Sequence, residues 1–313
     1  MTRPAYIDLY VSFGVAPQGV IVRGRVLAGH RPLLGEAGAH VLERLRNSWD
    51  LLETDELPDV AVAVSFLGDG PAATHRAHTD HEGFFAVRVR GPIAPGPHRV
   101  QAAVESPPHE GSPSDALALV YPPGPGLAVV SDIDDTVLAT DVRDRLALAR
   151  RVLLSTPEDL TTFPGAPELY RRFAAAGMPT VFISGSPWNL EPRLRAFFAL
   201  RGFPTAPLLL KDLGLGRGAD PLIDQESYKL RRIFMAMLEL PERRLVLIGD
   251  SGERDPEIYR RVQEEYPDRV AAIYIRRATA EDPRAPRFAG TVVFDDYATV
   301  AQDLETRGLL PAG

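Results

Sequence analysis

The 313-residue sequence contains no cysteine. This absence excludes disulfide bonds, thiolate metal centres and cysteine nucleophiles. Without disulfides, the chain must be held together by an apolar core, and its composition is suited to forming one. Apolar residues make up 45% of the sequence and charged residues 25%, which is typical of a globular protein of one or two domains.

Histidine is confined to the first part of the chain, because all seven histidines come before residue 110. Any chemistry after that point must therefore use carboxylates, hydroxyls, lysine, arginine or a metal ion, and a Ser–His–Asp site is excluded there. Lysine is scarce as well. Of the 35 lysine and arginine residues, only Lys211 and Lys229 are lysines, so each is a candidate for a role that a planar guanidinium cannot fill.

Long apolar runs are also absent. The first residues lack the apolar centre of a signal peptide, and no segment has the length that spans a bilayer. We therefore expect a cytoplasmic protein, with any membrane contact peripheral. A net charge of −7 does not favour broad attraction to nucleic acid, and the sequence carries no indication of the oligomeric state.

Residues 1–125 show the pattern of a small β-domain. Short segments of alternating apolar and polar residues are separated by turns that contain glycine and proline. Residues 39–56 instead place apolar side chains at helical spacing. The pattern predicts a β-sandwich-like accessory domain with an inserted helix. The expected strands cover residues 20–27, 60–66, 84–89, 98–104 and 116–120.

Three histidines in this part of the chain, His75, His78 and His81, are spaced three residues apart. Such spacing could indicate a site for Zn²⁺ or Cu²⁺. On the inferred strand pair, however, His78 would point to the opposite face from the other two. A surface hairpin is therefore the preferred interpretation of this segment.

Residues 121–126, with the sequence YPPGPG, contain nothing suited to a helix or a strand and mark a domain boundary. After this linker, strands and helices alternate, which predicts an α/β domain over residues 126–313 with a Rossmann-like, doubly wound parallel sheet. The expected strands are 127–131, 180–183, 207–210, 244–248, 270–275 and 291–294. The expected helices are about 141–154, 165–176, 188–201, 226–239 and 256–265, with a last one from 297.

Residues 127–136, LAVVSDIDDT, combine an apolar strand with a group of carboxylates. The first four residues form the unbroken apolar run of a parallel strand that is buried on both faces. Asp132, Asp134 and Asp135 follow within four residues and repel one another unless a cation or a reaction uses them. Because ligands bind at the carboxyl ends of such strands, we expect a Mg²⁺ site here. The alternative is a solvated acidic turn.

Two later strands also end in polar residues. One is followed by Ser184 and Gly185 at the start of a helix, and the other by the acidic loop 249–255. Lys229 lies near the start of the helix between them. A hydroxyl and helix-start amides can bind an anion, a lysine can neutralise charge, and carboxylates can hold a cation. Together these groups predict a phosphate site with Mg²⁺ at one edge of the sheet.

This arrangement resembles the haloacid dehalogenase superfamily of phosphotransferases. Four motifs match in order over residues 127–313: DxDxT at 132–136, a hydroxyl at Ser184, a lysine at Lys229, and GD with a later acid at Gly249, Asp250 and Asp255. Within the superfamily, the segments DIDDT, SGSPWNL and GDSGERDPEIY resemble the Mg²⁺-dependent phosphatidate phosphatases of the actin-patch-protein type. The resemblance implies hydrolysis of phosphatidate to diacylglycerol.

The resemblance also implies a mechanism through an aspartyl phosphate. Asp132 is the implied nucleophile, and Asp134 is the implied general acid and base. The implied metal site consists of Asp132, the backbone carbonyl of Asp134, Asp250 and Asp255 around Mg²⁺. Asp255 could instead orient Lys229 or a metal-bound water, and the spacing would also allow Glu253 in its place.

The implied phosphate-binding groups are the Ser184 hydroxyl, the Gly185 amide and the Lys229 amine. Lys229 is preferred to Lys211 because it falls at the helix start that the motif requires. Thr136 completes the first motif as a further substrate-binding candidate, although it could serve only to cap the turn.

Cap domains of this superfamily are inserted after the first motif or between the second and third. Neither gap in this chain is long enough for a full cap, so we expect an open site without a large cap. An open site suits a large substrate or one presented at a surface, such as a lipid in a membrane. The accessory domain is expected to present that substrate or a partner.

Two alternatives stay open. The same site could act on a phosphorylated protein, a nucleic acid end or another large phosphoester, because substrate choice lies in loops outside the shared core. The domain could also be a non-catalytic module that binds Mg²⁺ without turnover.

Overall fold

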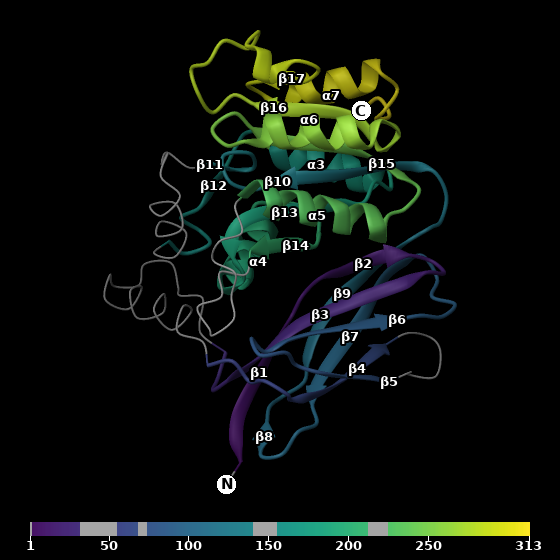
Figure 1. The fold of residues 1–313 in the computed structure, drawn as a ribbon, viewed down its shortest axis with the longest axis vertical. Helices are drawn as coiled ribbons and strands as arrows, with labels where there is room; N and C mark the ends of the chain where they lie inside the picture. The colour runs from purple at the N-terminus through teal and green to yellow at the C-terminus, as the bar shows by residue number, and fades with distance from the viewer. Residues whose placement is uncertain (1, 32–54, 68–73, 140–154, 212–224) are drawn as a thin grey trace. The chain divides into compact units, whose positions relative to one another are not determined.

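A computed structural model describes residues 2–31, 55–67, 74–139, 155–211 and 225–313 (Figure 1). The described residues divide into two compact units, one up to Pro123 and one from Gly124. The division falls inside the proline- and glycine-rich segment 121–126. Within the described part of the chain, no helix is long and apolar enough to cross a membrane.

The first unit is a sheet of nine strands (Figure 1). These are β1 (Arg3–Leu9), β2 (Ser12–Val15), β3 (Gly19–Ala28), β4 (Ala61–Leu67), β5 (Thr74–His78), β6 (Phe84–Val89), β7 (Gly96–Val104), β8 (His109–Glu110) and β9 (Ser114–Tyr121). The strand order is β5–β4–β7–β9–β2–β3–β1–β8, and β6 pairs with β3. Most neighbours are antiparallel, whereas the pairs β1–β8 and β2–β9 are parallel.

Alternate side chains of these strands fill one apolar core. Val22 of β3 and Val87 of β6 are buried in the same cluster as Val64 of β4 and Val100 of β7. Because strands from both ends of the sheet contribute to this cluster, the sheet folds over its own core, as in a β-sandwich. The β-sandwich-like architecture predicted for this part of the chain is therefore present.

The five strands predicted for this unit are present as β3, β4, β6, β7 and β9. The first residues, which show only alternation in the sequence, form β1 and β2. The predicted helix 39–56 lies outside the described residues up to position 54, and the described end of it is not helical. There Glu56 forms an isolated bridge with Leu27, and its carboxylate pairs with Arg25 at 2.8 Å.

His75, His78 and His81 do not come together. His78 is exposed on β5, and its Nδ1 atom lies 3.1 Å from the Oδ1 atom of Asp59. His75 is half-buried on the opposite face of the strand, and His81 lies exposed in the turn that follows. The side chains of a strand alternate between its faces, so two residues that are three positions apart, such as His75 and His78, point to opposite faces.

The second unit is an α/β structure with a six-stranded parallel sheet (Figure 1). Its strands are β10 (Gly126–Asp132), β13 (Thr180–Pro187), β14 (Leu208–Lys211), β15 (Arg243–Asp250), β16 (Val270–Arg276) and β17 (Val292–Phe294). Its α-helices are α3 (Ala166–Ala175), α4 (Glu191–Leu200), α5 (Gln225–Glu239), α6 (Asp255–Glu265) and α7 (Tyr297–Thr306). Short 3₁₀ turns are η1 (Trp188–Leu190), η2 (Pro267–Arg269) and η3 (Pro286–Phe288), and a small separate pair joins β11 (Leu138–Ala139) to β12 (Thr161–Thr162).

The strand order β14–β13–β10–β15–β16–β17 shows that the sheet is doubly wound. From β10 the chain moves outward to β13 and β14, then returns and moves the other way through β15, β16 and β17. Helices α5 and α6 pack together on one face, and α3 and α7 pack together on the other (Figure 1). The direction of winding reverses between β10 and β15, and ligands bind at such a switch point.

The strands and helices predicted for the described residues of this unit are present, with two differences. Strand β13 continues beyond residue 183 to Pro187, with an irregular register against β14, so Ser184 and Ser186 extend the strand. The pair β11–β12 was not expected, because two-residue strands carry no periodicity. The predicted helix 141–154 lies outside the described residues, as do parts of both segments in which a cap would be inserted.

Candidate active site

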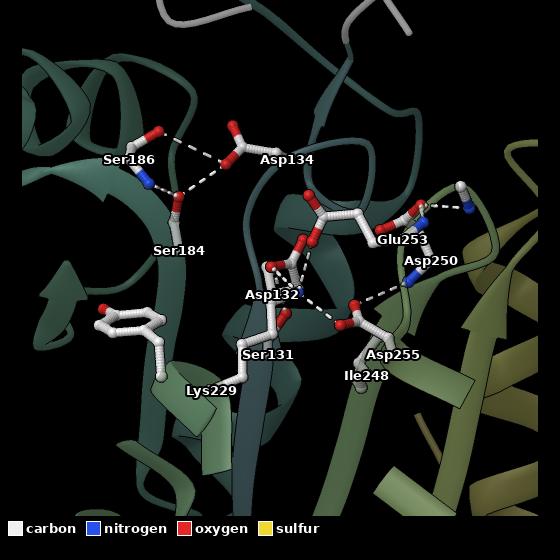
Figure 2. A network of polar contacts seen from close by, with 12 residues as sticks. Ser131, Asp132, Asp134, Ser184, Ser186, Lys229, Ile248, Asp250, Glu253 and Asp255 are labelled. Carbon is white, nitrogen blue, oxygen red and sulfur yellow. Dashed lines mark hydrogen bonds and ion pairs between the residues drawn. The ribbon is translucent and has the colours of Figure 1, made fainter. Parts of the chain in front are cut away.

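The polar ends of β10, β13 and β15 meet at one edge of the sheet, as Figure 2 shows. Because β10 pairs with both neighbours in parallel, its carboxyl end lies beside theirs. Asp132 is the last residue of β10, Asp250 is the last residue of β15, and Ser184 lies on β13. The winding of the sheet thus brings together three segments that are far apart in the sequence.

Lys229 on the first turns of α5 enters this group from beside the sheet. Its side chain is almost completely buried, and its Nζ atom lies 2.7 Å from Asp132 Oδ1 and 2.8 Å from Glu253 Oε2. It also forms an ion pair with Asp255. Lys211, the other lysine, is the last residue of the edge strand β14. The structure therefore brings Lys229 to the carboxylates.

The loop after β15 is shaped around the Asp250 carboxylate. Its Oδ1 atom accepts hydrogen bonds from the amides of Gly252 at 2.6 Å and Glu253 at 3.1 Å. The amide of Asp250 in turn donates to Asp255 Oδ2 at 3.2 Å. Asp255 therefore uses one oxygen for this amide and the other for Lys229, and both interactions hold the loop against α6.

Four carboxylates converge where these segments meet. One oxygen from each of Asp132, Asp250, Glu253 and Asp255 lies within 4.8 Å of the others. Two buried oxygens in this group, Asp132 Oδ2 and Asp250 Oδ2, have no hydrogen-bond partner among the residues that the structure describes. Hard divalent cations prefer such oxygens, so the donor set fits a metal ion of this class.

Electrostatics at the cluster also favour a cation. Burial raises the pKa of Asp132 well above its usual range; Lys229 lowers this pKa in part, and the neighbouring carboxylates raise it further. Burial and Asp255 likewise raise the pKa of Asp250. Burial lowers the pKa of the Lys229 amine, but Asp132, Asp255 and Glu253 outweigh this and hold it well above its usual range. An added cation would favour the ionised carboxylates, so cation binding and proton release are coupled.

Asp134 has different surroundings from Asp132, although only one residue separates them. Its Oδ2 atom accepts a hydrogen bond of 2.6 Å from the Ser184 hydroxyl, and Ser186 Oγ lies 3.5 Å away (Figure 2). Burial raises the pKa of Asp134 to about 6, against the opposing effect of the Ser184 hydrogen bond. Its side chain is not part of the four-carboxylate cluster. The side chains of the two aspartates in this motif thus lie in different parts of the site, Asp132 beside Lys229 and Asp134 beside Ser184.

The loop between Asp134 and β11 is held by two residues that the sequence analysis missed. Asp135 has a φ of 51°, and its carbonyl accepts a hydrogen bond from Arg276 at the end of β16. The carbonyl of Thr136 accepts one from the Tyr297 hydroxyl. Arg276 directly follows a predicted strand, so its position at the sheet edge was available as a signal. Nothing in the sequence points to Tyr297.

The remaining candidates take distinct positions. The Thr136 side chain is fully buried, and its hydroxyl has no hydrogen-bond partner among the described residues. Gly185 is exposed, and a Cβ atom there would meet nothing within 4 Å. The space beside the Gly185 Cα atom is therefore open. Thr136 contributes its backbone carbonyl to the loop contact described above.

Gly249→Ala is expected to destabilise the second unit by about 1–3 kcal/mol, the usual cost of overpacking a tight site. A Cβ atom at position 249 would lie 2.7 Å from the Cβ of Asp255 and overlap its carboxylate. Asp255 would have to move away from the Asp250 amide and from Lys229. Thermal unfolding in the presence of a chelator measures the effect.

Gly185→Ala is the matched control for that substitution, because the same methyl group is added in open space. We expect its melting temperature to stay within about 1 °C of the unchanged protein, since surface substitutions without contacts are nearly neutral. Equal destabilisation by both substitutions would contradict the role assigned to close packing at Gly249.

Comparison with known proteins identifies the domain that carries this site. Residues 127–277 match a family model described as "Phosphatidate phosphatase APP1, catalytic domain". This segment is therefore similar to that family. The matched range includes Asp132, Asp134, Ser184, Lys229 and Asp250. The family resemblance predicted from the motifs is therefore confirmed.

Two curated relatives match the chain over part of their own length. An uncharacterized protein of Schizosaccharomyces pombe is 30% identical over 151 residues, which cover 48% of this chain and 25% of the relative. Phosphatidate phosphatase APP1 of Saccharomyces cerevisiae is 25% identical over 227 residues, covering 71% of this chain and 38% of the relative. The chain thus spans between a quarter and two fifths of the length of these relatives.

Solved structures of phosphatases are also similar to the chain. A D,D-heptose 1.7-bisphosphate phosphatase from B. bronchiseptica, complexed with magnesium and phosphate, has a TM-score of 0.38 at 15% identity, covering 58% of this chain and 99% of that one. A HAD family hydrolase from Deinococcus radiodurans R1, with bound phosphate and sodium, has a TM-score of 0.39 at 17% identity, covering 61% and 100%.

Proposed function

We propose that the chain is a Mg²⁺-dependent phosphatidate phosphatase, with residues 126–313 as the catalytic domain and residues 1–125 as an accessory domain. The observation that carries this proposal is the contrast between the two aspartates at the end of β10. Asp132 faces Lys229 and the carboxylate cluster, whereas Asp134 faces the Ser184 hydroxyl with a pKa raised by burial to about 6. One site therefore offers a carboxyl group beside a lysine, whose ionised form a bound cation would favour, and a second carboxyl group that can carry a proton.

Mg²⁺ would be held by Asp132 and Asp250, because each has a buried oxygen free of hydrogen bonds to the described residues. The backbone carbonyl of Asp134 and the Glu253 carboxylate are further candidate ligands. Both oxygens of Asp255 already have partners, which favours its role as the residue that orients Lys229. When bound, the ion supplies positive charge that offsets the charge of the phosphate and the carboxylates together.

In the proposed reaction, the Asp132 carboxylate attacks phosphorus and forms an aspartyl phosphate. Asp134 donates its proton to the leaving alkoxide of diacylglycerol and later accepts a proton from the attacking water. A pKa of about 6 suits both tasks near neutral pH. Lys229, Ser184 and the backbone amide of Gly185 hold the phosphoryl oxygens during transfer.

Phosphatidate is proposed as the substrate on the strength of the family match and of the open space at Gly185. A phosphomonoester on a large lipid can reach such a site only if the surroundings of the phosphate are not enclosed. We propose that the protein acts on this lipid at a membrane surface from the cytoplasm, to which it binds peripherally.

Phosphate release from phosphatidate in mixed micelles and from p-nitrophenyl phosphate tests the proposal, with the metal-free protein in chelator and after addition of Mg²⁺. We expect release from both substrates only with Mg²⁺, and a kcat/KM for phosphatidate at least about tenfold higher. Binding energy from the lipid body, away from the reacting phosphate, gives this advantage.

A phosphorylated peptide and an oligonucleotide with a terminal phosphate serve as competing substrates in the same assay. A preference for either of these substrates over phosphatidate would support the phosphatase activity but contradict phosphatidate as the substrate. Mg²⁺ binding without release from any of the four substrates would contradict the enzyme proposal and favour a binding module.

A further inference from the structure

Arg287 lies on η3, outside the residues that match the family model, yet it contacts the acidic loop of the site. Its Nη2 atom donates to the carbonyl of Glu253 at 2.8 Å, and its Nη1 atom donates to the carbonyl of Ser251 at 3.2 Å. The same guanidinium forms a two-pronged ion pair with Glu257 at 2.9 and 3.2 Å. Its Nη1 atom also reaches Glu281 at 2.9 Å.

The loop 251–253 is therefore bound from both sides. Its carbonyls at 251 and 253 accept from Arg287, while its amides at 252 and 253 donate to the Asp250 carboxylate at 2.6 and 3.1 Å. These amides occupy Asp250 Oδ1 and leave Oδ2 without a hydrogen bond to the described residues. The loop thus determines the direction in which Asp250 Oδ2 points. Arg287 in turn holds the loop in position through the carbonyls of Ser251 and Glu253.

We propose that Arg287 is a positioning residue that holds the 251–253 loop so that Asp250 and Glu253 are preset for a divalent cation. The inference rests on the proposed function in one respect, because it takes the carboxylate cluster to be the metal site. A guanidinium is required here, since its planar fork reaches two carbonyls and two carboxylates at once, whereas an ammonium is a compact point charge. Groups that orient metal ligands typically contribute 10- to 100-fold to metal affinity.

The loop is also held by hydrogen bonds in which the Arg287 guanidinium takes no part. Ser251 Oγ accepts hydrogen bonds from the amides of Ala278 at 2.9 Å and Thr279 at 3.1 Å. Loss of the guanidinium should therefore loosen the path of the loop without unfolding it. Arg287→Lys keeps the positive charge beside Glu257 and Glu281, so it removes the fork while disturbing the charge balance least.

The experiment measures Mn²⁺ and Mg²⁺ binding to the metal-free full chain by titration calorimetry, together with kcat and KM for p-nitrophenyl phosphate at saturating Mg²⁺. For Arg287→Lys we expect metal binding to be at least about tenfold weaker, with the KM for the ester changed by less than about threefold. The melting temperature in chelator should stay within a few degrees of the wild type.

Glu281→Gln is the matched control, because it removes an ion pair of Arg287 but no contact to the loop. Its metal affinity should stay within about twofold of the wild type. Arg287→Lys with unchanged metal affinity, or an equal loss in Glu281→Gln, would overturn the proposal.

The same measurements distinguish failure of the proposed phosphatase function from failure of the proposal for Arg287. A wild-type chain that binds metal but releases no phosphate would contradict the phosphatase, and the affinity comparison would still test Arg287. A wild-type chain that binds neither ion would contradict both proposals.

Discussion

Asp132→Asn is expected to lower kcat for phosphate release by about a thousandfold or more, which is the usual scale for loss of a covalent nucleophile. The amide has the size of the carboxylate but cannot attack phosphorus. Its oxygen can still face the Lys229 amine, which lies 2.7 Å from Asp132 Oδ1. The fold should therefore persist while turnover is lost. Phosphate release from phosphatidate and from p-nitrophenyl phosphate gives the rates.

Asp135→Asn is the control for this substitution, because it removes the same charge from the same motif. Asparagine tolerates the left-handed conformation of this residue, whose φ is 51°. We expect its kcat to stay within about threefold of the wild type. Acid quenching during turnover should also trap phosphate on the peptide that contains residue 132 in the wild type. Residual activity above about 10% in Asp132→Asn, or label on another residue, would place the nucleophile elsewhere.

The sheet domain was largely predictable because its strands are buried on both faces. Unbroken apolar runs such as 127–130 and 245–248 are typical of strands inside a parallel sheet, and each is followed by polar residues. Parallel pairing then places those residues at one edge without any knowledge of the contacts. This is why Asp132, Ser184 and Asp250 could be grouped from the sequence before their distances were known.

The residues that hold the site in place could not be predicted in the same way. Tyr297 reaches a carbonyl 161 residues earlier in the chain, and Arg276 reaches one 141 residues earlier. Arg287 contacts the 251–253 loop at two backbone carbonyls, and these two contacts do not depend on which side chains the loop carries. Such contacts depend on the final packing of loops, for which apolar periodicity gives no signal.

The roles of the two aspartates in the first motif also could not be predicted from the residues alone. The motif alone makes Asp132 and Asp134 chemically equivalent, and only the resemblance to a family distinguished them. In the structure the difference has a physical cause. Asp132 meets a lysine and three carboxylates, whereas Asp134 meets hydroxyls on β13. The different roles proposed for the two aspartates thus depend on the neighbouring segments, not on the segment that carries both.

Lys229→Met is expected to lower the free energy of unfolding of the sheet domain by about 3–5 kcal/mol in chelator, because removing one partner of a buried ion pair leaves charges uncompensated. Lys229 is 1% exposed and contacts Asp132, Glu253 and Asp255. Methionine has a similar length but cannot balance these carboxylates. Mg²⁺ should restore part of the lost stability, since a bound cation stabilises only the folded state. Catalytic activity should remain lost even then.

Lys211→Met provides the comparison, because it removes the other lysine of the chain at the end of β14. Its effect on unfolding should be smaller than that of Lys229→Met, because Lys211 lies outside the carboxylate cluster. Differential scanning calorimetry with and without Mg²⁺ measures both variants. The decisive quantity is the gain in melting temperature on adding Mg²⁺, which should be larger in Lys229→Met than in the wild type or Lys211→Met. Equal gains in all three proteins would mean that the lysine and the metal ion do not compensate the same charges.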